Sequence, residues 1–131
     1  MGMEQTVTFA PDGLPTYDTV SALLAAQGFP LQLRMIDGEL AFPDEKPSEG
    51  WHELRVGTPQ GMITLRRAAD RLSFVTWGNA DRALTQAWNA LVWAFAHVGA
   101  GHVLTERGPI SADEYRGTAD LPNVLRQDRA T

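Results

Sequence analysis

Two histidines and a glutamate near the end of a predicted helix are the side chains in this chain that could bind a metal. His97, His102 and Glu106 supply the nitrogen and oxygen ligands that zinc accepts. Their spacing matches no established zinc motif, and the segment 99–101, Gly-Ala-Gly, redirects the chain between the histidines. Because the chain has no cysteine, thiolate ligands and a thiolate nucleophile are also excluded. We therefore predict no metal site and no cofactor.

A serine followed by two acidic residues is the nearest approach to a catalytic group. Ser111 precedes Glu114 by three residues, which is the spacing of a helix capping box. We interpret this serine as a helix cap rather than as a nucleophile, and no histidine has a sequence reason to lie beside it. The sequence favours a protein that is not an enzyme.

A tryptophan on the longest predicted helix, over residues 80–98, points away from the apolar stripe of that helix. At about 100° per residue, the stripe that should face a sheet consists of Leu84, Trp88, Leu91, Phe95 and Val98. Trp93 lies about 180° from this stripe. Its neighbours on the helix surface are the polar residues Asn89 and His97.

Several interpretations of Trp93 are open. The C-terminal segment could fold back over the ring, and the apolar residues available for this are Leu121, Val124 and Leu125. A second subunit or another protein could cover it, because aromatic side chains are enriched at interfaces. The ring could line a small-molecule pocket with Asn89 and His97 as polar guides, or it could simply be exposed.

Arginines gather on one face of the predicted sheet. Pairing Val56 with Ile63 and Leu54 with Leu65 makes one face apolar, and the same register places Glu53 opposite Arg66. The other face then carries Arg34, Trp51, Arg55 and Arg66. These residues could bind an acidic peptide, a phosphate or another subunit. The alternative is an ordinary solvated face.

Turn residues define the strands that carry these arginines. Asp37-Gly38 predicts a two-residue hairpin turn that places Met35 opposite Leu40 and Leu33 opposite Phe42, all on one face. Three more strands follow over residues 51–56, 61–67 and 71–77. The register of the last strand stays open because both of its faces carry apolar residues.

Capping residues define the helices. Thr16 is a candidate N-cap for a helix over residues 16–27 that ends at Gly28. Asn79 can cap the long helix, and Gly99 ends it. A short edge strand is expected over residues 6–9, a further strand over 102–106, and short helices after Ser111 and over 121–127.

Composition limits the class of protein. Of the 131 residues, 44% are hydrophobic and 21% are charged, as in soluble globular proteins. The net charge of -5 disfavours nucleic-acid binding, which requires clustered cations. The longest apolar run, 90–101, is shorter than the roughly 20 residues that cross a membrane. We expect no signal peptide and a cytoplasmic location, in keeping with the lack of cysteine.

These elements predict one α+β domain over residues 1–131. A five-stranded antiparallel meander follows the helix over 16–27 and precedes the long helix, and both helices pack on one face of the sheet in two layers. Residues 1–4 and 127–131 are expected to be disordered, and Met1-Gly2 is interpreted as a cloning remnant.

The size, the acidity and the helix-before-sheet order resemble those of small dimeric secretion chaperones and of bacterial adaptor and immunity proteins. This likeness is one of shape and rests on no motif. The position of Trp93 and the lack of a catalytic motif favour a non-catalytic protein-interaction module. We predict that it binds itself as a homodimer, or another protein, through the Trp93 helix face or the arginine-bearing sheet face. The alternative is a small-molecule-binding protein or an enzyme with a pocket near Asn89, Trp93 and His97.

Overall fold

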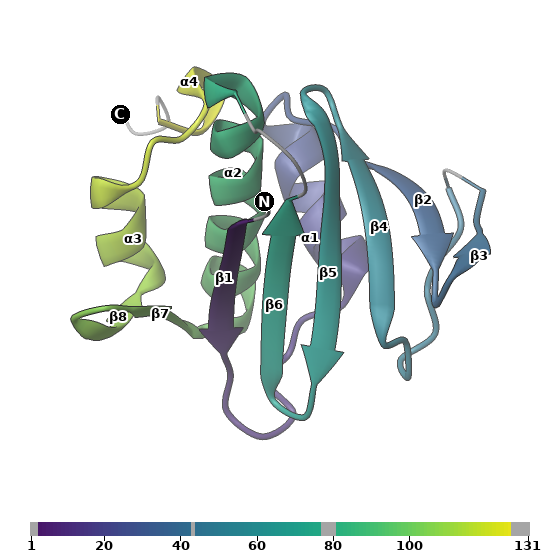
Figure 1. The fold of residues 1–131 in the computed structure, drawn as a ribbon, viewed down its shortest axis with the longest axis horizontal. Coiled ribbons are helices and arrows are strands. Elements are labelled where there is room, and N and C mark those ends of the chain that lie inside the picture. Colours follow the sequence, from purple (N-terminus) through teal and green to yellow (C-terminus); the bar gives the residue numbers. More distant parts are fainter. Residues whose placement is uncertain (1–2, 43, 77–80, 127–131) are drawn as a thin grey trace.

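One eight-stranded antiparallel sheet forms one layer of the protein, and helices form the other (Figure 1). The computed structural model describes residues 3–42, 44–76 and 81–126. The strands are β1 (Met3–Thr8), β2 (Gln32–Ile36), β3 (Glu39–Leu40), β4 (Glu53–Thr58), β5 (Gly61–Ala68), β6 (Arg71–Thr76), β7 (His102–Thr105) and β8 (Gly108–Ser111). The helices are α1 (Tyr17–Ala26), α2 (Arg82–Gly99), α3 (Ala112–Thr118) and α4 (Asn123–Arg126).

The order of strands in the sheet is β3-β2-β4-β5-β6-β1-β7-β8. Helices α1 and α2 lie on the same side of this sheet, and none of the described helices covers the other face of β4, β5 and β6 (Figure 1). We call the helix-covered face the inner face and the opposite face the outer face. The predicted α+β class and two-layer arrangement are confirmed, whereas the predicted five-stranded sheet is wrong.

The main departure from the prediction is the place of β1. Val7 pairs with Leu72 of β6 on one side and with Val103 of β7 on the other. The predicted edge strand over residues 6–9 is therefore an interior strand. It joins the meander to the β7–β8 hairpin, and this long-range pairing explains most of the additional strands.

The start of β1 also corrects the expectation for the N-terminus. Met3 and Glu4 were predicted to be disordered, but they pair with Thr76 and Val75 of β6. The other residues expected to be disordered or to be a cloning remnant, 1–2 and 127–131, lie outside the described residues.

The predicted register of β4 and β5 is confirmed. Val56 pairs with Ile63, Leu54 pairs with Leu65, and these four side chains are fully buried on the inner face. On the outer face the Arg66 Nε lies 3.1 Å from a Glu53 carboxylate oxygen. The register left open for β6 is fixed by its pairing with β5 and β1: Leu65 pairs with Phe74, which is fully buried on the inner face, and Val75 lies on the opposite face at 6% exposure.

The hairpin of β2 and β3 departs from the prediction because of a β-bulge. Met35 pairs with Leu40 as predicted, but the register of β2 against β4 shifts between Leu33 and Met35. A one-residue shift moves the following side chains to the opposite face. Leu33 is therefore buried on the inner face, whereas Leu40 and Phe42 are exposed. The prediction that all four apolar residues share one face is wrong.

The predicted stripe of α2 faces the sheet. Leu91 and Phe95 are fully buried, and the Phe95 ring meets Phe74 of β6 edge-on with 5.6 Å between ring centres. The Trp88 Nε1 donates a hydrogen bond of 2.8 Å to the carbonyl of Phe74. In the described part of the chain, no helix is both long and apolar enough to cross a membrane.

The helix caps agree with the prediction at α1 and α3 and differ from it at the two ends of α2. Thr16 caps α1 by accepting from the Thr19 backbone N–H, and Ser111 forms the predicted capping box with Glu114. α2 is capped by Asp81, whereas the predicted cap, Asn79, lies outside the described residues. Gly99 is the last residue of α2, and Ala100 takes the left-handed conformation with φ of 51°.

Candidate binding surface

The C-terminal part of the chain covers the tryptophan that points away from the sheet. Trp93 is only 2% exposed. The Arg116 guanidinium of α3 lies 4.9 Å from the centre of its ring, and the exposed imidazole of His97 stacks on it at 5.1 Å. Leu121 and Leu125 are fully buried in the same core. Of the interpretations of Trp93, cover by the C-terminal segment is the one that the structure shows.

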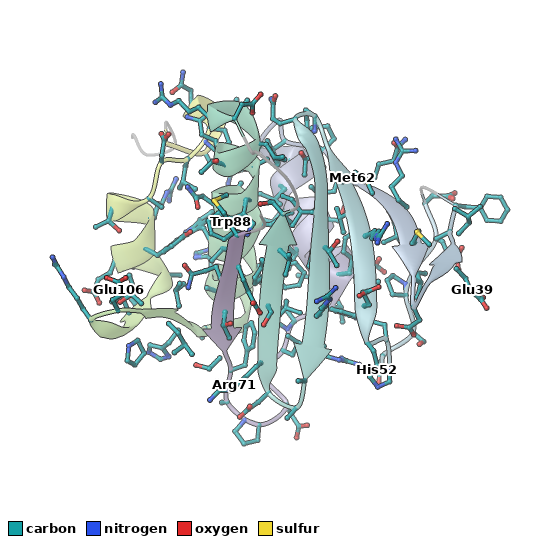
Figure 2. The ribbon with its side chains drawn as sticks, viewed as in Figure 1. Glu39, His52, Met62, Arg71, Trp88 and Glu106 are labelled. Atoms are coloured by element: carbon teal, nitrogen blue, oxygen red, sulfur yellow. The ribbon has the colours of Figure 1, made fainter. Side chains whose placement is uncertain are left out.

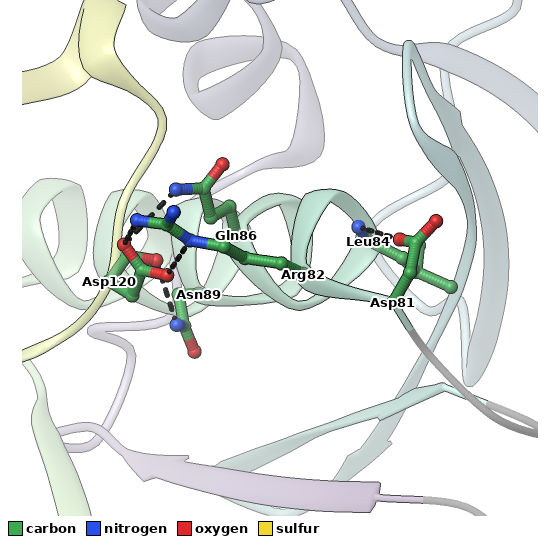
Figure 3. Close-up of polar contacts among 6 residues, drawn as sticks. All are labelled: Asp81, Arg82, Leu84, Gln86, Asn89 and Asp120. Atoms are coloured by element: carbon green, nitrogen blue, oxygen red, sulfur yellow. Dashed lines mark hydrogen bonds and ion pairs between the residues drawn. The ribbon is translucent and has the colours of Figure 1, made fainter.

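Polar contacts hold this cover against α2. The carboxylate of Asp120 accepts hydrogen bonds from Arg82 at 2.9 and 3.3 Å and from Gln86 at 3.0 Å. The backbone carbonyl of Asp120 accepts one from Asn89 at 2.9 Å, and Figure 3 shows these donors reaching Asp120 from α2. Residues before α4 are thus fixed to the first half of α2.

Both the nitrogen and the oxygen of the Asn89 side-chain amide form hydrogen bonds. Its nitrogen bonds to Asp120, and its oxygen accepts a hydrogen bond of 2.9 Å from the Tyr115 hydroxyl. Burial raises the pKa of Tyr115, so this hydroxyl stays protonated and remains a donor. The structure therefore brings Asn89, Trp93 and His97 together, but it packs the first two inside the protein. Val124, proposed with Leu121 and Leu125 as cover, is 42% exposed.

The arginine-bearing face is formed as predicted, except at one residue. Arg55 of β4 and Arg66 of β5 are exposed on the outer face, and Arg34 lies at the bulge of β2. Trp51 does not join them. It is buried in the core, and the Arg67 guanidinium lies 4.8 Å from its ring centre. The reason is that β4 begins at Glu53, so strand alternation does not extend back to the tryptophan.

Exposed apolar side chains lie beside Arg34 and Arg55. Leu40 is 88% exposed, Phe42 is 75% exposed and Met62 is 42% exposed. Together with Val124 of α4 they are the large apolar residues most exposed in the described part of the chain. A hollow of about 660 Å³ lies among Leu40, Phe42 and Met62, and Val124 does not line it. We define the outer patch as the residues that line it: Arg34, Met35, Leu40, Ala41, Phe42, Arg55 and Met62.

The bulge and a glycine together place an arginine over this hollow. Gly57 of β4 pairs with Met62, and a side-chain carbon at Gly57 would lie 3.2 Å from the Nε of Arg34. The lack of a side chain at Gly57 thus lets Arg34 lie across β4 toward Met62. The outer patch is at the β3 end of the sheet; Figure 2 shows Glu39 of β3 and Glu106 of the β7–β8 turn at opposite ends.

Sequence reasoning missed the apolar half of the outer patch. Turn geometry and alternation predict that Leu40 and Phe42 share one apolar face with Leu33 and Met35, whereas Leu33 is buried on the inner face. The bulge that exposes them has no clear signal in the sequence. The arginines were found because charged side chains at alternate positions of a strand are expected to face solvent.

Asp37 anchors the hairpin that carries Leu40. One of its carboxylate oxygens accepts hydrogen bonds from the backbone N–H groups of His52, at 2.7 Å, and Glu53, at 2.8 Å. These bonds, the one from Glu53 first, lower the pKa of Asp37 below its ordinary value of 3.8. The turn residue therefore ties β2 and β3 to the start of β4.

We predict that Asp37→Asn flattens the acid dependence of stability. Because the pKa is lowered on folding, the carboxylate's contribution is fully present above pH 3.8 and is lost as the pH falls through the lowered value. Replacing it with an amide removes this contribution at every pH, so the variant should lose less stability on acidification. Carboxyl NMR titration of the wild type checks the premise. A pKa of Asp37 at or above 3.8 would contradict it.

A second hollow, of about 610 Å³, lies at the end of the sheet beside Trp51 and the β5–β6 turn. The cation at this site is already engaged, because Arg67 donates a hydrogen bond of 2.6 Å to the carbonyl of Glu49 and covers the Trp51 ring. The charged groups left to meet a ligand are carboxylates such as Asp12 and Asp70. We place no function at this hollow.

Comparison with protein-family models, with curated proteins and with solved structures finds no match for this chain. Among the described residues, no three histidine, aspartate or glutamate side chains are grouped so as to hold a metal ion. We therefore take the outer patch, with its exposed apolar side chains and two arginines, as the candidate binding site.

Proposed function

We propose that this protein is a non-catalytic interaction module of the adaptor or chaperone kind, and that it holds another protein against the outer patch. The observation that carries the proposal is the exposure of Leu40, Phe42 and Met62 on a sheet face that no helix covers. Contiguous exposed apolar surface with a polar rim is typical of protein interaction sites. Aromatic, methionine and arginine side chains are the types enriched there.

The face of the sheet is a better candidate than its edges. The edge strand β3 has two residues, and the other edge strand, β8, contains Pro109, which has no backbone N–H to donate. Short edges and edge prolines are features that discourage strand addition. Side chains on the outer face are therefore the groups that would meet a partner.

The outer patch also has more support than the Trp93 face. Trp93 is covered by Arg116 of the same chain, and both the nitrogen and the oxygen of the Asn89 amide are hydrogen-bonded within the protein. The same contacts weaken the alternative of a small-molecule pocket near Asn89, Trp93 and His97. Binding through the Trp93 face would require α3 and the segment around Asp120 to move away.

Affinity capture from a lysate of the native host tests this proposal. We expect the double variant Leu40→Ser/Phe42→Ser to recover at least about tenfold less of the partner than the wild type, because hot-spot residues carry most of the binding energy. Val124→Ser is the matched control, since it removes an exposed apolar residue on α4. It should recover as much as the wild type.

Both variants should keep the circular dichroism spectrum of the wild type, since the residues replaced are exposed. Equal recovery by the wild type and the double variant would refute the outer patch as the binding site. Light scattering on the pure protein tests the predicted homodimer separately.

A further inference from the structure

The outer patch carries two arginines that have no acidic partner in the described part of the chain. Arg34 and Arg55 are exposed, and no ion pair or hydrogen bond joins the guanidinium group of either one to a described residue. Other arginines of the protein are engaged: Arg66 with Glu53, Arg82 with Asp120, Arg67 with Trp51 and Arg116 with Trp93. On a protein of net charge -5, the outer patch is therefore locally cationic.

The acidic side chains near the outer patch do not offset these arginines. Glu39 precedes Leu40 on β3, so strand alternation directs it to the other side of the strand. Glu45 accepts a hydrogen bond of 3.1 Å from the backbone N–H of Phe42. Among the residues that the structure describes, no carboxylate lines the hollow itself.

This charge pattern disfavours a second copy of the chain as the occupant. In a two-fold dimer the same surface meets itself, so the arginines of both copies would enter one apolar contact without a carboxylate to pair with. Unpaired charges in a buried contact are costly. A partner with acidic groups next to apolar ones avoids this cost and gains charge-assisted hydrogen bonds to two guanidinium groups.

We propose that the outer patch binds an acidic, apolar segment of another protein: its aliphatic or aromatic side chains enter the hollow beside Phe42 and Met62, and its carboxylates bind Arg34 and Arg55. This inference rests on the proposed function and adds the chemistry of the partner to it. The two can fail separately, because the capture experiment removes apolar side chains, whereas the charge of the partner is tested through the arginines.

Methionine methyl groups provide a direct readout of this site. Of the four methionines, Met35 and Met62 line the hollow, whereas Met3 lies on β1. Protein labelled with ¹³C at the methionine methyl groups would be titrated with two synthetic peptides. In the first, glutamates flank leucine and phenylalanine; in the second, lysines replace the glutamates. We expect the acidic peptide to shift the signals of Met35 and Met62 and to leave that of Met3 unchanged.

Arginine variants test the role of charge. Arg34→Gln/Arg55→Gln should weaken binding of the acidic peptide by about tenfold or more, since two charge-assisted contacts are lost. Arg107→Gln, at an exposed arginine of the β7–β8 turn, is the matched control and should leave binding unchanged. Binding of the acidic peptide should also weaken as salt is added, because exposed charges are screened.

Four results would overturn the inference. The first is equal binding of both peptides, and the second is stronger binding of the lysine peptide. The third is the absence of any shift of Met35 and Met62 with either peptide. The fourth is a dimer in sedimentation analysis that Phe42→Ser converts to monomer, which would make a second copy the occupant. Equal binding of both peptides with sensitivity to Phe42→Ser would leave the proposed function standing and remove only the charge requirement.

Discussion

Replacing Trp93 with alanine should lower the free energy of unfolding by about 3–5 kcal/mol, as for other large aromatic residues removed from a core. The indole is 2% exposed and contacts both the Arg116 guanidinium and the imidazole of His97. Its removal would leave a cavity between α2 and the C-terminal segment. Because Leu121 and Leu125 pack in the same core, that segment should also become more mobile. Urea unfolding followed by circular dichroism measures the loss.

His97→Ala is the control for this prediction. The imidazole stacks on the same ring but is exposed, so its removal should cost less than about 1 kcal/mol, in the range of surface substitutions. A Trp93→Ala variant within 1 kcal/mol of the wild type would contradict the intramolecular cover. It would bring back the interpretation in which another molecule covers the ring.

Gly101→Ala should destabilise the protein by about 1–3 kcal/mol or more, which is the cost of overpacking a filled site. An alanine side chain there would lie 2.6 Å from the backbone carbonyl oxygen of Thr8 and 2.8 Å from the ring of Phe9. Thr8 belongs to the interior strand β1, which is paired on both sides and cannot shift without disturbing β6 or β7. Thermal or urea unfolding gives the magnitude.

The neighbouring substitution Ala100→Gly is the matched control. Ala100 has φ of 51°, a left-handed conformation that glycine adopts without steric cost. The gain from relieving this conformation is offset by the greater flexibility of glycine in the unfolded chain, so the net change should lie within about 1 kcal/mol of zero. If Gly101→Ala were as mild as this control, β1 would not pack against the end of α2 as described.

The segment that contains Ala100 and Gly101 also shows what local sequence signals can and cannot predict. A glycine after a long helix is the usual site of a left-handed residue, and the sequence predicts that the long helix ends at Gly99. The left-handed residue is Ala100 instead, because both flanking glycines are required for close contact. A side chain at Gly99 would lie 2.7 Å from Phe9 and Pro15, and this contact depends on the tertiary structure alone.

Signals that act over a few residues predicted much of the fold. The caps Thr16 and Ser111 and the register that pairs Glu53 with Arg66 follow from turn and alternation chemistry, and all are present. The interior place of β1 could not be predicted in this way. Its partners lie about 65 and 95 residues away along the chain, and no local pattern specifies such a pairing.

The candidate site was predicted only in part, for the same reason. Strand alternation predicts the outward direction of Arg34 and Arg55, but it places Leu40 and Phe42 on the same face as the buried Leu33. A one-residue bulge between Leu33 and Met35 reverses the direction of the apolar side chains. The position of Trp93 opposite the apolar stripe indicates that something covers the ring, but the sequence does not show whether this is the protein's own C-terminal segment or a partner.

Hydrogen exchange with mass spectrometry on the complex with the most strongly captured host protein tests the central claim most directly. If the partner binds the outer patch, exchange should slow over residues 32–42 and 53–62 and stay unchanged over α2 and α3. Slower exchange confined to residues 82–99 and 112–118 would contradict the account and place the partner on the Trp93 face.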